Sequence, residues 1–401
     1  MPMIEGWKET TLGEVAEIVK DQWLPGDADQ KYIGLEHINQ GDLQINSFGC
    51  SSSLQSNKFY FKQGDILFGK LRPYFRKVWK ARFDGVCSTD IWVLRAKEGY
   101  DQNYLFYFMA NPVFIDKSTG ASIGTKMPRA DWDFLKRSKW LFPPLSEQRA
   151  IAAILSSFDD KIELLRRQNK TLEAIAQAIF KEWFVKFKVK GEQLKLNPKT
   201  GLPEGWRMGK LEDVIEIYGG GTPKTDIPEY WNGDIPWFSV ADVPGEGNVY
   251  VIECEKHISK QGLENSSTKV LPRNTTIITA RGTVGKLALT GVPMAMNQSC
   301  YGIAPKDRRS FFYFYLLMKE SLATLKQQVH GAVFDTITRD TLNNISTIIP
   351  ASEVLKDLHI AVKPMFQKVL QNNSQIQTLS KLRDTLLPKL MKGEIRVKRE
   401  E

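Results

Sequence analysis

The chain has few of the residues that mark metal sites and disulfide frameworks. Only 4 of its 401 residues are Cys, and only 4 are His. Cys50, Cys87, Cys254 and Cys300 include no C-x-x-C pair, so their spacing favours neither a zinc site nor a set of disulfides. The His residues show no metal-ligand spacing with one another or with carboxylates. We therefore expect four reduced thiols and no bound metal.

Long apolar runs and targeting signals are also lacking. The longest apolar run, residues 311–318, is much shorter than the about 20 residues that cross a bilayer. Residues 1–6 do not show the charged-then-apolar pattern of a secretory signal. We therefore expect a protein of the reducing cytoplasm with no membrane partner.

Motifs for catalysis on nucleotides are missing as well. Residues 219–224 are rich in Gly but lack the Gly-Lys-hydroxyl group of a phosphate-binding loop. Pro143 follows Phe142, which cannot bond a base amine as the Asp, Asn or Ser of an amino-methyltransferase motif does. We find neither a glycine-rich motif for S-adenosylmethionine nor a nuclease carboxylate cluster. The sequence thus predicts a chain without catalytic residues, and an enzyme with an unrecognised active site is the alternative.

The chain does contain an internal repeat, in which one sequence pattern occurs twice. Glu-Gly-Trp at residues 5–7 returns at 204–206, and each copy is followed by Leu, Val and Ile at intervals of three. Later, Pro-Leu-Ser-Glu at residues 144–147 returns as Pro-Ala-Ser-Glu at 350–353. A chain of 401 residues exceeds what one core usually serves, so two domains of about 150 residues are expected.

Each late motif opens a long heptad pattern. Apolar residues recur at steps of four and three from Ile151 to Trp183, and again from Leu355 to Leu390. Pro364 lies inside the second pattern, so we expect a kink or a break there. Two long apolar stripes need a partner, and the simplest partner for each is the other. An antiparallel pair of helices, with the domains at opposite ends and an approximate two-fold relation, satisfies the connectivity.

Asn169 and Asn372 are polar residues in these mostly apolar seams. An antiparallel pair that brings the two Asn residues together also sets Ile151 against Leu390 and uses nearly the full length of both patterns. A buried Asn pair would fix the register of the helices. The alternative is that one or both Asn side chains lean to solvent.

Each globular copy mixes short β-like runs with one apolar helical segment, which indicates a mixed α/β (α+β) fold. The predicted divisions are a first domain at 1–144, a long helix at 145–190, a linker at 191–203, a second domain at 204–350, a second long helix at 351–392 and a charged tail at 393–401.

Basic segments in each copy favour a polyanionic partner. The net charge is +9. Between Lys58 and Arg82 the basic residues are interleaved with aromatic ones, and Asp65 is the only acidic residue. Segments 122–129 and 332–339 add short polar side chains beside basic ones. Any single cation is as readily a solvated surface charge, so the prediction rests on the set. The candidate DNA-binding residues are Lys70, Arg72, Tyr74, Arg76, Lys77, Lys126 and Arg129 in the first copy, and Lys224, Ser239, Arg281, Thr283, Lys286, Thr336, Thr338 and Arg339 in the second.

The motifs, taken in this order and twice, resemble those of the specificity subunit of bacterial type I restriction-modification enzymes. The resemblance covers essentially the whole chain and includes residues 32–38, 143–148, 219–223 and 230–242. A mild departure is Val354, which stands where the first copy has Gln148.

This resemblance implies two target-recognition domains, each reading one half of a split sequence in double-stranded DNA. It implies two modification (methyltransferase) subunits docked on the helices, restriction and translocase subunits in the full complex, and S-adenosylmethionine on the modification subunits, with no cofactor on this chain. Two domains related by a near two-fold would read half-sites about one helical turn apart. Each domain is expected to read about three to five base pairs. A scaffold whose basic surface is incidental is a weaker third possibility.

Overall fold

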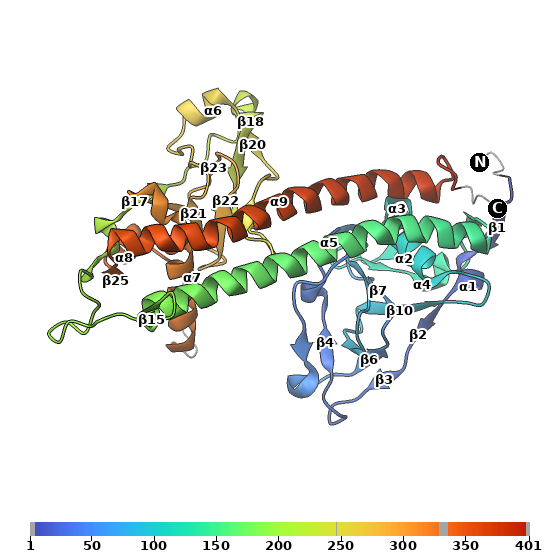
Figure 1. The fold of residues 1–401 in the computed structure, drawn as a ribbon. Helices are drawn as coiled ribbons and strands as arrows, with labels where there is room; N and C mark the ends of the chain where they lie inside the picture. Colours follow the sequence, from blue (N-terminus) through green and yellow to red (C-terminus); the bar gives the residue numbers. More distant parts are fainter. Residues whose placement is uncertain (1–4, 246, 329–335, 398–401) are drawn as a thin grey trace. The chain divides into compact units, whose positions relative to one another are not determined.

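The computed structural model describes residues 5–245, 247–328 and 336–397, without the side chains of 323–328. Contacts divide the chain into two compact units, residues 1–162 with 377–401 (unit 1) and residues 163–376 (unit 2). Two long helices, α5 (Leu145–Phe180) and α9 (Ser352–Met391), contribute residues to both units (Figure 1). The last residues of the predicted tail, 398–401, lie outside the described residues.

Unit 1 is built around a four-stranded antiparallel sheet, whose strands lie in the order β2 (Ala16–Val19), β10 (Ile91–Ala96), β7 (Ile66–Gly69) and β8 (Val78–Lys80). Side chains alternate across a strand, and here both faces are buried. Ile66 and Phe68 of β7 enter one apolar cluster with α2 and α3, whereas Leu67 enters a second cluster with the neighbouring five-stranded sheet. The apolar runs at residues 66–68 and 91–94 form strands because each strand serves two cores.

The five-stranded sheet is β3 (Gln22–Trp23), β6 (Lys58–Phe61), β9 (Gly85–Cys87), β4 (Lys31–Ile33) and β5 (Gly49–Cys50). The other elements of unit 1 are β1 (Lys8–Thr11) paired with β13 (Lys139–Phe142), β11 (Ser122–Ile123) paired with β12 (Arg129–Ala130), α1 (Leu12–Val15), α2 (Gln102–Ala110), α3 (Pro112–Gly120), α4 (Trp132–Leu135), and the 3₁₀ turns η1 (Leu35–His37), η2 (Ser51–Ser53) and η3 (Pro73–Phe75).

Unit 2 has a five-stranded sheet in the order β17–β24–β21–β22–β19 and a three-stranded sheet in the order β20–β18–β23. Its strands are β17 (Ile215–Gly219), β24 (Cys300–Pro305), β21 (Thr276–Thr279), β22 (Leu287–Thr290), β19 (Tyr250–Val251), β20 (His257–Ile258), β18 (Trp231–Phe238) and β23 (Ala295–Met296). Its other elements are β14 (Lys188–Val189) with β15 (Glu192–Gln193), β16 (Arg207–Lys210) with β25 (Ser346–Ile349), α6 (Lys260–Glu264), α7 (Phe311–Gln328), α8 (Arg339–Asn343), η4 (Lys181–Val185), η5 (Leu211–Asp213), η6 (Pro228–Tyr230), η7 (Val240–Asp242) and η8 (Arg308–Ser310).

The internal repeat predicted from the sequence is confirmed at the level of strand pairing. The order β2–β10–β7–β8 in unit 1 has the counterpart β17–β24–β21–β22 in unit 2. The antiparallel pair β1–β13 matches β16–β25, and the parallel pair β4–β9 matches β18–β23. Each copy therefore repeats a whole mixed α/β domain, and not only a few motifs.

The two long helices also form as the heptads predict. In unit 1, Ile151 and Leu155 of α5 share a buried cluster with Leu387 and Leu390 of α9. In unit 2, Ala176 of α5 lies in a cluster with residues 358–370 of α9. Also in unit 1, the later Asp159 pairs with the earlier Arg383. In unit 2, Asn169, which precedes Ala176, bonds Asn372, which follows residues 358–370. Within each unit the pairing of the two helices is therefore antiparallel.

The structure differs from the helix prediction in two details. The first helix ends in the π-helical turn η4 at Val185, and not at residue 190, because the chain turns into the hairpin of β14 and β15 with positive φ at Phe187 and Lys190. The predicted break at Pro364 is wrong because the second helix continues through this residue, whereas a kink there stays a prediction. Proline leaves the carbonyl four residues earlier without its helical donor, and that residue, Ile360, is 61% exposed, so water can satisfy it.

All four cysteines are free thiols, as expected, with Cys50 exposed and the other three buried.

Candidate nucleic-acid interface

In unit 1 the basic loop after β7 packs against the hairpin of β11 and β12, which comes much later in the chain. The amide of Ala130 donates to the carbonyl of Lys70 at 2.9 Å. The amide of Arg72 donates to the carbonyl of Pro128 at 2.7 Å. These backbone bonds join the two basic segments that the sequence singles out, so their side chains share one surface.

Two arginines of this loop have a left-handed backbone. Arg72 has φ 51° and Arg76 has φ 53°, on either side of η3. Residues other than glycine keep this conformation only where their surroundings hold it. Arg72 is held through its side chain as well, since Nη2 donates to the carbonyl of Lys126 at 3.3 Å. The Nε atoms of both arginines are buried without a hydrogen-bond partner among the described residues. The loop is thus a fixed and strained element, which is typical of functional sites.

Lys77, also predicted to contact DNA, points into the protein. Its Nζ donates to the carbonyl of Leu35 in η1 at 2.5 Å, and burial lowers the pKa of this ammonium. The geometry makes Lys77 a support for the loop. Within the described chain, by contrast, the ammonium groups of Lys70 and Lys126 have no ion-pair partner. Tyr74, on η3, is 45% exposed.

Arg129 is exposed but oriented by a carboxylate. Its Nε and Nη2 donate to the two carboxylate oxygens of Asp90 at 2.9 Å and 3.3 Å. These hydrogen bonds raise the pKa of Arg129. A guanidinium held in this way keeps a fixed direction, although the attached carboxylate reduces the net positive charge it presents.

Unit 2 repeats the arrangement at the equivalent place. The loop after β21 meets the segment that leads into α8: the amide of Ile337 donates to the carbonyl of Ala280 at 2.9 Å, and Arg281 forms an isolated β-bridge with Thr336. The same kind of bridge links the loop after β7 to β12 in unit 1. Residues 332–335 of the second predicted segment lie outside the described residues. The structure thus brings the predicted loop and segment together in both repeats.

The candidate side chains of this second loop form fewer contacts with the rest of the protein than those of the first loop. Arg281, Thr283 and Lys286 are exposed, and Thr336 is exposed beside them. In the described part of unit 2, the charged groups of Arg281 and Lys286 have no ion-pair partner. They are therefore available to a ligand.

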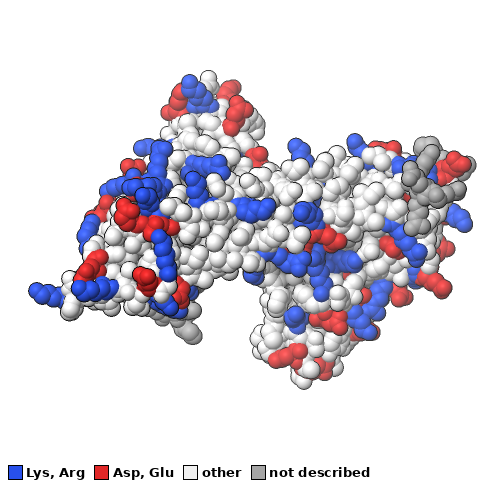
Figure 2. Space-filling view, viewed as in Figure 1, with Lys and Arg blue, Asp and Glu red and all other residues white. Residues whose placement is uncertain are grey.

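Two candidates next to this loop also have structural contacts. Thr338 caps α8 by accepting a hydrogen bond from the amide of Thr341 at 3.1 Å. Arg339 donates through Nη2 to the carbonyl of Ile217 in β17 at 3.0 Å. Figure 2 shows Lys and Arg side chains gathered over the part of unit 2 that holds α8 and β17, with acidic side chains beside them.

The remaining two candidates lie beside β18. Lys224 is exposed, and its carbonyl accepts a hydrogen bond from the indole of Trp231 at 3.1 Å. The hydroxyl of Ser239 donates to the carboxylate of Asp242 at 2.8 Å and so closes η7. The hydroxyl of Ser239 is thus committed to a turn.

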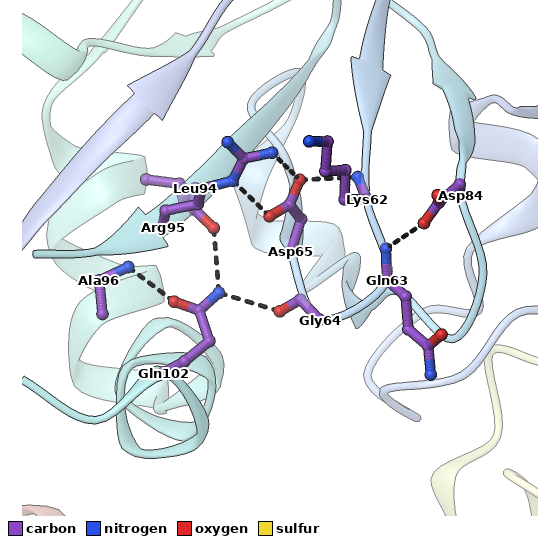
Figure 3. Close-up of polar contacts among 9 residues, drawn as sticks. All are labelled: Lys62, Gln63, Gly64, Asp65, Asp84, Leu94, Arg95, Ala96 and Gln102. Carbon is purple, nitrogen blue, oxygen red and sulfur yellow. Dashed lines mark hydrogen bonds and ion pairs between the residues drawn. The ribbon is translucent and has the colours of Figure 1, made fainter.

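The acidic residue of the first basic stretch, Asp65, lies at the far end of β7. Its carboxylate accepts bonds from Arg95 Nε at 2.7 Å, from Arg95 Nη2 at 2.8 Å and from the amide of Lys62 at 2.8 Å (Figure 3). A strand rises about 3.3 Å per residue, so Asp65 is roughly 17 Å along the chain from Lys70. Its charge compensates Arg95 and leaves the loop basic.

Comparison with known proteins decides the family. The model described as the type I restriction modification DNA specificity domain matches residues 4–174 and, a second time, residues 203–371. The chain belongs to this family of specificity subunits. It is a specificity subunit of a type I restriction-modification system with two target-recognition domains, as the sequence predicts.

Individual relatives agree over most of the chain. The HindI specificity subunit of Haemophilus influenzae is 26% identical and covers 97% of this chain and 99% of the relative. The MjaIX specificity subunit of Methanocaldococcus jannaschii is 30% identical and covers 75% and 71%. The crystal structure of the type I S subunit from M. genitalium has a similar fold, with a TM-score of 0.55 at 15% identity over 97% of this chain and 98% of that one.

In this specificity subunit the two seam asparagines meet, as predicted. Asn372 donates to the side-chain oxygen of Asn169 at 2.8 Å, and Asn169 donates to that of Asn373 at 2.7 Å. Asn373 in turn donates to the carbonyl of Tyr250 in β19 at 3.3 Å. All three amides are buried. Sequence reasoning missed Asn373 because it lies outside the heptad seam. Whether these contacts set the register remains a prediction.

The helix contact within unit 1 of the specificity subunit is ionic. Arg383, 1% exposed, donates through Nη1 to Asp159 at 2.6 Å, and the hydroxyl of Tyr107 donates to the other oxygen of Asp159 at 2.6 Å. Asp384 also pairs with Arg383, at 3.0 Å. Burial alone would lower the pKa of Arg383, but the two carboxylates raise it. The heptad pattern shows Arg383 as a polar exception but gives no indication of its partner.

The start of α5 in the specificity subunit explains the difference between Gln148 and Val354. Gln148 donates to the carbonyl of Pro143 at 2.9 Å and accepts from the amide of Asp101, the residue that caps α2, at 2.9 Å. Val354 packs on an apolar cluster instead. At the start of its long helix, the first repeat thus has polar side-chain contacts with the domain where the second repeat has apolar ones.

The described residues of this specificity subunit contain no group of three or more His, Cys, Asp or Glu side chains placed to hold a metal ion. Nor does any helix among them combine the length and hydropathy needed to cross a bilayer.

Proposed function

We propose that this specificity subunit is a non-catalytic DNA reader, which recognises a two-part sequence in double-stranded DNA with one half-site per target-recognition domain. The observation that carries the proposal is the repeated contact between a basic loop and a later segment, after β7 in unit 1 and after β21 in unit 2. Two equivalent surfaces on one chain fit a target with two halves better than they fit a single continuous site.

The chemistry of these surfaces fits both parts of DNA recognition. Exposed cations such as Lys126 and Lys286 suit phosphates, which set the position of a protein on the duplex. Arginines such as Arg129 and Arg281 have the planar donor pair that matches the guanine edge in the major groove. Threonine hydroxyls beside them can serve several bases. Each domain therefore has the groups to position itself and to read sequence.

The partners follow from the role. A reader without catalytic residues needs methyltransferase subunits that bind S-adenosylmethionine, and two repeats favour two such subunits docked through the long helices. Restriction and translocase subunits would join the same complex, and the chain itself would need no cofactor. Because its target is the DNA of the cell, we place the protein in the cytoplasm.

Methyl transfer from labelled S-adenosylmethionine to DNA tests this proposal. The purified chain alone should transfer no methyl group, whereas the chain with its methyltransferase partner should modify one sequence split by a spacer. Turnover by the chain alone would contradict the non-catalytic role and favour an enzyme with an unrecognised active site. Assembly and binding that ignore DNA sequence would instead favour a scaffold.

A further inference from the structure

The hairpin of β11 and β12 exposes apolar side chains in the middle of a basic surface. Ile123 is 68% exposed, the largest value for a large hydrophobic side chain among the described residues, and Met127 is 50% exposed. Tyr74, 45% exposed, lies on the loop bonded to this hairpin. A single exposed apolar residue is ordinary, but a group of them on a functional surface indicates a contact with a partner.

The hairpin is fixed at its base and open at its tip. Its first strand is tied to α3 by the hydroxyl of Ser122, which donates to the carbonyl of Ser118 at 2.8 Å. Its second strand is tied to the loop after β7 by the bonds of Lys70 and Arg72 described above. A Cβ added at Gly124 would meet only the backbone of Met127, at 3.5 Å, and the positive φ of Gly124 (96°) turns the chain there. The exposed side chains are therefore presented by a braced element, and little conformational entropy is lost when it binds.

The charges around the tip decide which partner fits. Lys126 lies between the two apolar positions in sequence, and Arg129 follows them. The carbonyl of Lys126 accepts the bond from Arg72, so three cations lie on or beside the hairpin that carries Ile123 and Met127. One of them, Arg129, is paired with Asp90. An apolar surface for another protein has a mixed or neutral rim, whereas Arg72, Lys126 and Arg129 leave this hairpin with a net positive charge even when Asp90 is counted. Double-stranded DNA matches it, because phosphates surround base edges that are themselves partly apolar.

We propose that Ile123 and Met127 contact the bases of the half-site read by unit 1, while Lys126 and Arg129 hold the flanking phosphates or base edges. Arg72 acts as a positioning residue: its hydrogen bond to the carbonyl of Lys126 holds the tip of the hairpin in place relative to the loop after β7. This inference rests on the proposed function and specifies how one domain reads its site. Two base features supply such an apolar contact: the methyl group of thymine in the major groove, and the face of a base exposed when a side chain enters the stack.

Equilibrium binding tests the inference, using the full chain with its methyltransferase partner. The DNA is a duplex with the motif that the wild-type complex methylates, and a duplex with the unit 1 half-site scrambled is the non-specific reference. The double variant I123A/M127A should lose roughly 10- to 100-fold in affinity for the specific duplex, because two apolar side chains no longer leave water. Its affinity for the scrambled duplex and its salt dependence should be unchanged, since no phosphate contact is lost.

Two matched variants sharpen this result. Lys126→Ala should weaken binding to both duplexes and reduce the slope of log affinity against log salt by about one. Leu24→Ala removes an apolar side chain of similar exposure, 47%, which belongs to the turn after β3, and should change neither binding nor salt slope. Equal loss on both duplexes, or no loss, for I123A/M127A would overturn the inference.

The DNA itself separates the two base features. Deoxyuridine in place of thymine in this half-site should cost about fourfold per contacted methyl, and only when Ile123 and Met127 are present. If the side chains enter the stack, 2-aminopurine in the half-site should brighten on binding to the wild type and not to the variant. If the complex shows neither of these two responses, the inference is overturned. If the wild-type complex does not distinguish the two duplexes at all, the proposed function fails, and not merely this account of the hairpin.

Discussion

The two units hold α5 and α9 together by different chemistry, although their domains repeat the same strand order. Unit 1 uses a buried ion pair, Arg383 with Asp159, completed by the hydroxyl of Tyr107. Unit 2 uses an amide cluster of Asn169, Asn372 and Asn373. The repeat has thus kept the backbone pairing and changed the polar contacts. Charge and amide contacts respond differently to substitution, so the comparison can be tested.

The largest effect is expected at Arg383. Arg383→Met leaves the carboxylate of Asp159 buried without its partner, which should cost roughly 3–5 kcal/mol in the free energy of unfolding. Denaturant unfolding of the purified chain, followed in unit 1, measures this loss. Asp384→Asn should have little effect because its side chain is 48% exposed.

A second variant separates the loss of the Arg383–Asp159 ion pair from the loss of side-chain packing. Replacing both partners, in D159L/R383M, should recover most of the lost stability, since no charge remains buried. A double variant as unstable as Arg383→Met would show that the ion pair is not what the single substitution disturbs.

A smaller effect is expected at the amide cluster. Asn169→Leu leaves the amides of Asn372 and Asn373 buried with fewer partners, which should cost about 1–3 kcal/mol. Denaturant unfolding of unit 2 measures it. If this cluster fixes the register, the pair N169L/N372L should also change the spacer preferred by the methylating complex. Unchanged stability together with an unchanged spacer would remove the register hypothesis.

The same comparison shows what the sequence can and cannot predict. The heptads and the strands at residues 66–68 and 277–279 are local patterns, so both the repeat and the paired helices are visible in them. Partners are not local: the carboxylate for Arg383 and the carbonyl for Lys77 belong to distant segments that no periodicity identifies. Composition alone therefore groups Lys77 with the exposed cations. The early end of α5 depends on positive φ at Phe187 and Lys190, which these residue types rarely adopt.

The candidate DNA-binding loops of the two units also differ in how their arginines are held. A substitution at Arg281 tests this difference. Arg129 is held by Asp90, whereas Arg281 has no ion-pair partner within the described chain. Arg281→Ala should therefore lower the affinity for the specific duplex about tenfold without changing the melting temperature. Arg281→Lys should restore binding if the contact is a phosphate and fail to restore it if the contact is a guanine edge. A lower melting temperature for Arg281→Ala would show a structural role instead.

The smallest effect is a pH dependence confined to unit 2. Burial and the nearby Lys363 lower the pKa of His359, although Asp307 and the carbonyl of Arg309 oppose the shift. The ring stacks on Phe312 with centroids 5.4 Å apart. Because the unfolded chain binds this proton more readily than the folded chain, stability should fall as the pH drops from about 7 through the unfolded value near 6.5.

His359→Phe keeps the stacking and should flatten this part of the pH profile, as measured by thermal unfolding between about pH 7 and 5.5. The equivalent position of the first repeat is Ala153, so unit 1 should show no such step. A step of equal size in the His359→Phe variant would assign the pH dependence to another group.

The central claim is that two equivalent basic surfaces on one chain read two separate half-sites. Sequencing of methylated bases in the host, with the wild-type chain, without it and with the I123A/M127A or Arg281→Ala chain, tests this claim most directly. The account predicts a split motif that disappears without the chain, and variants that each relax a different half. A continuous motif, or one half relaxed by both variants, would contradict it.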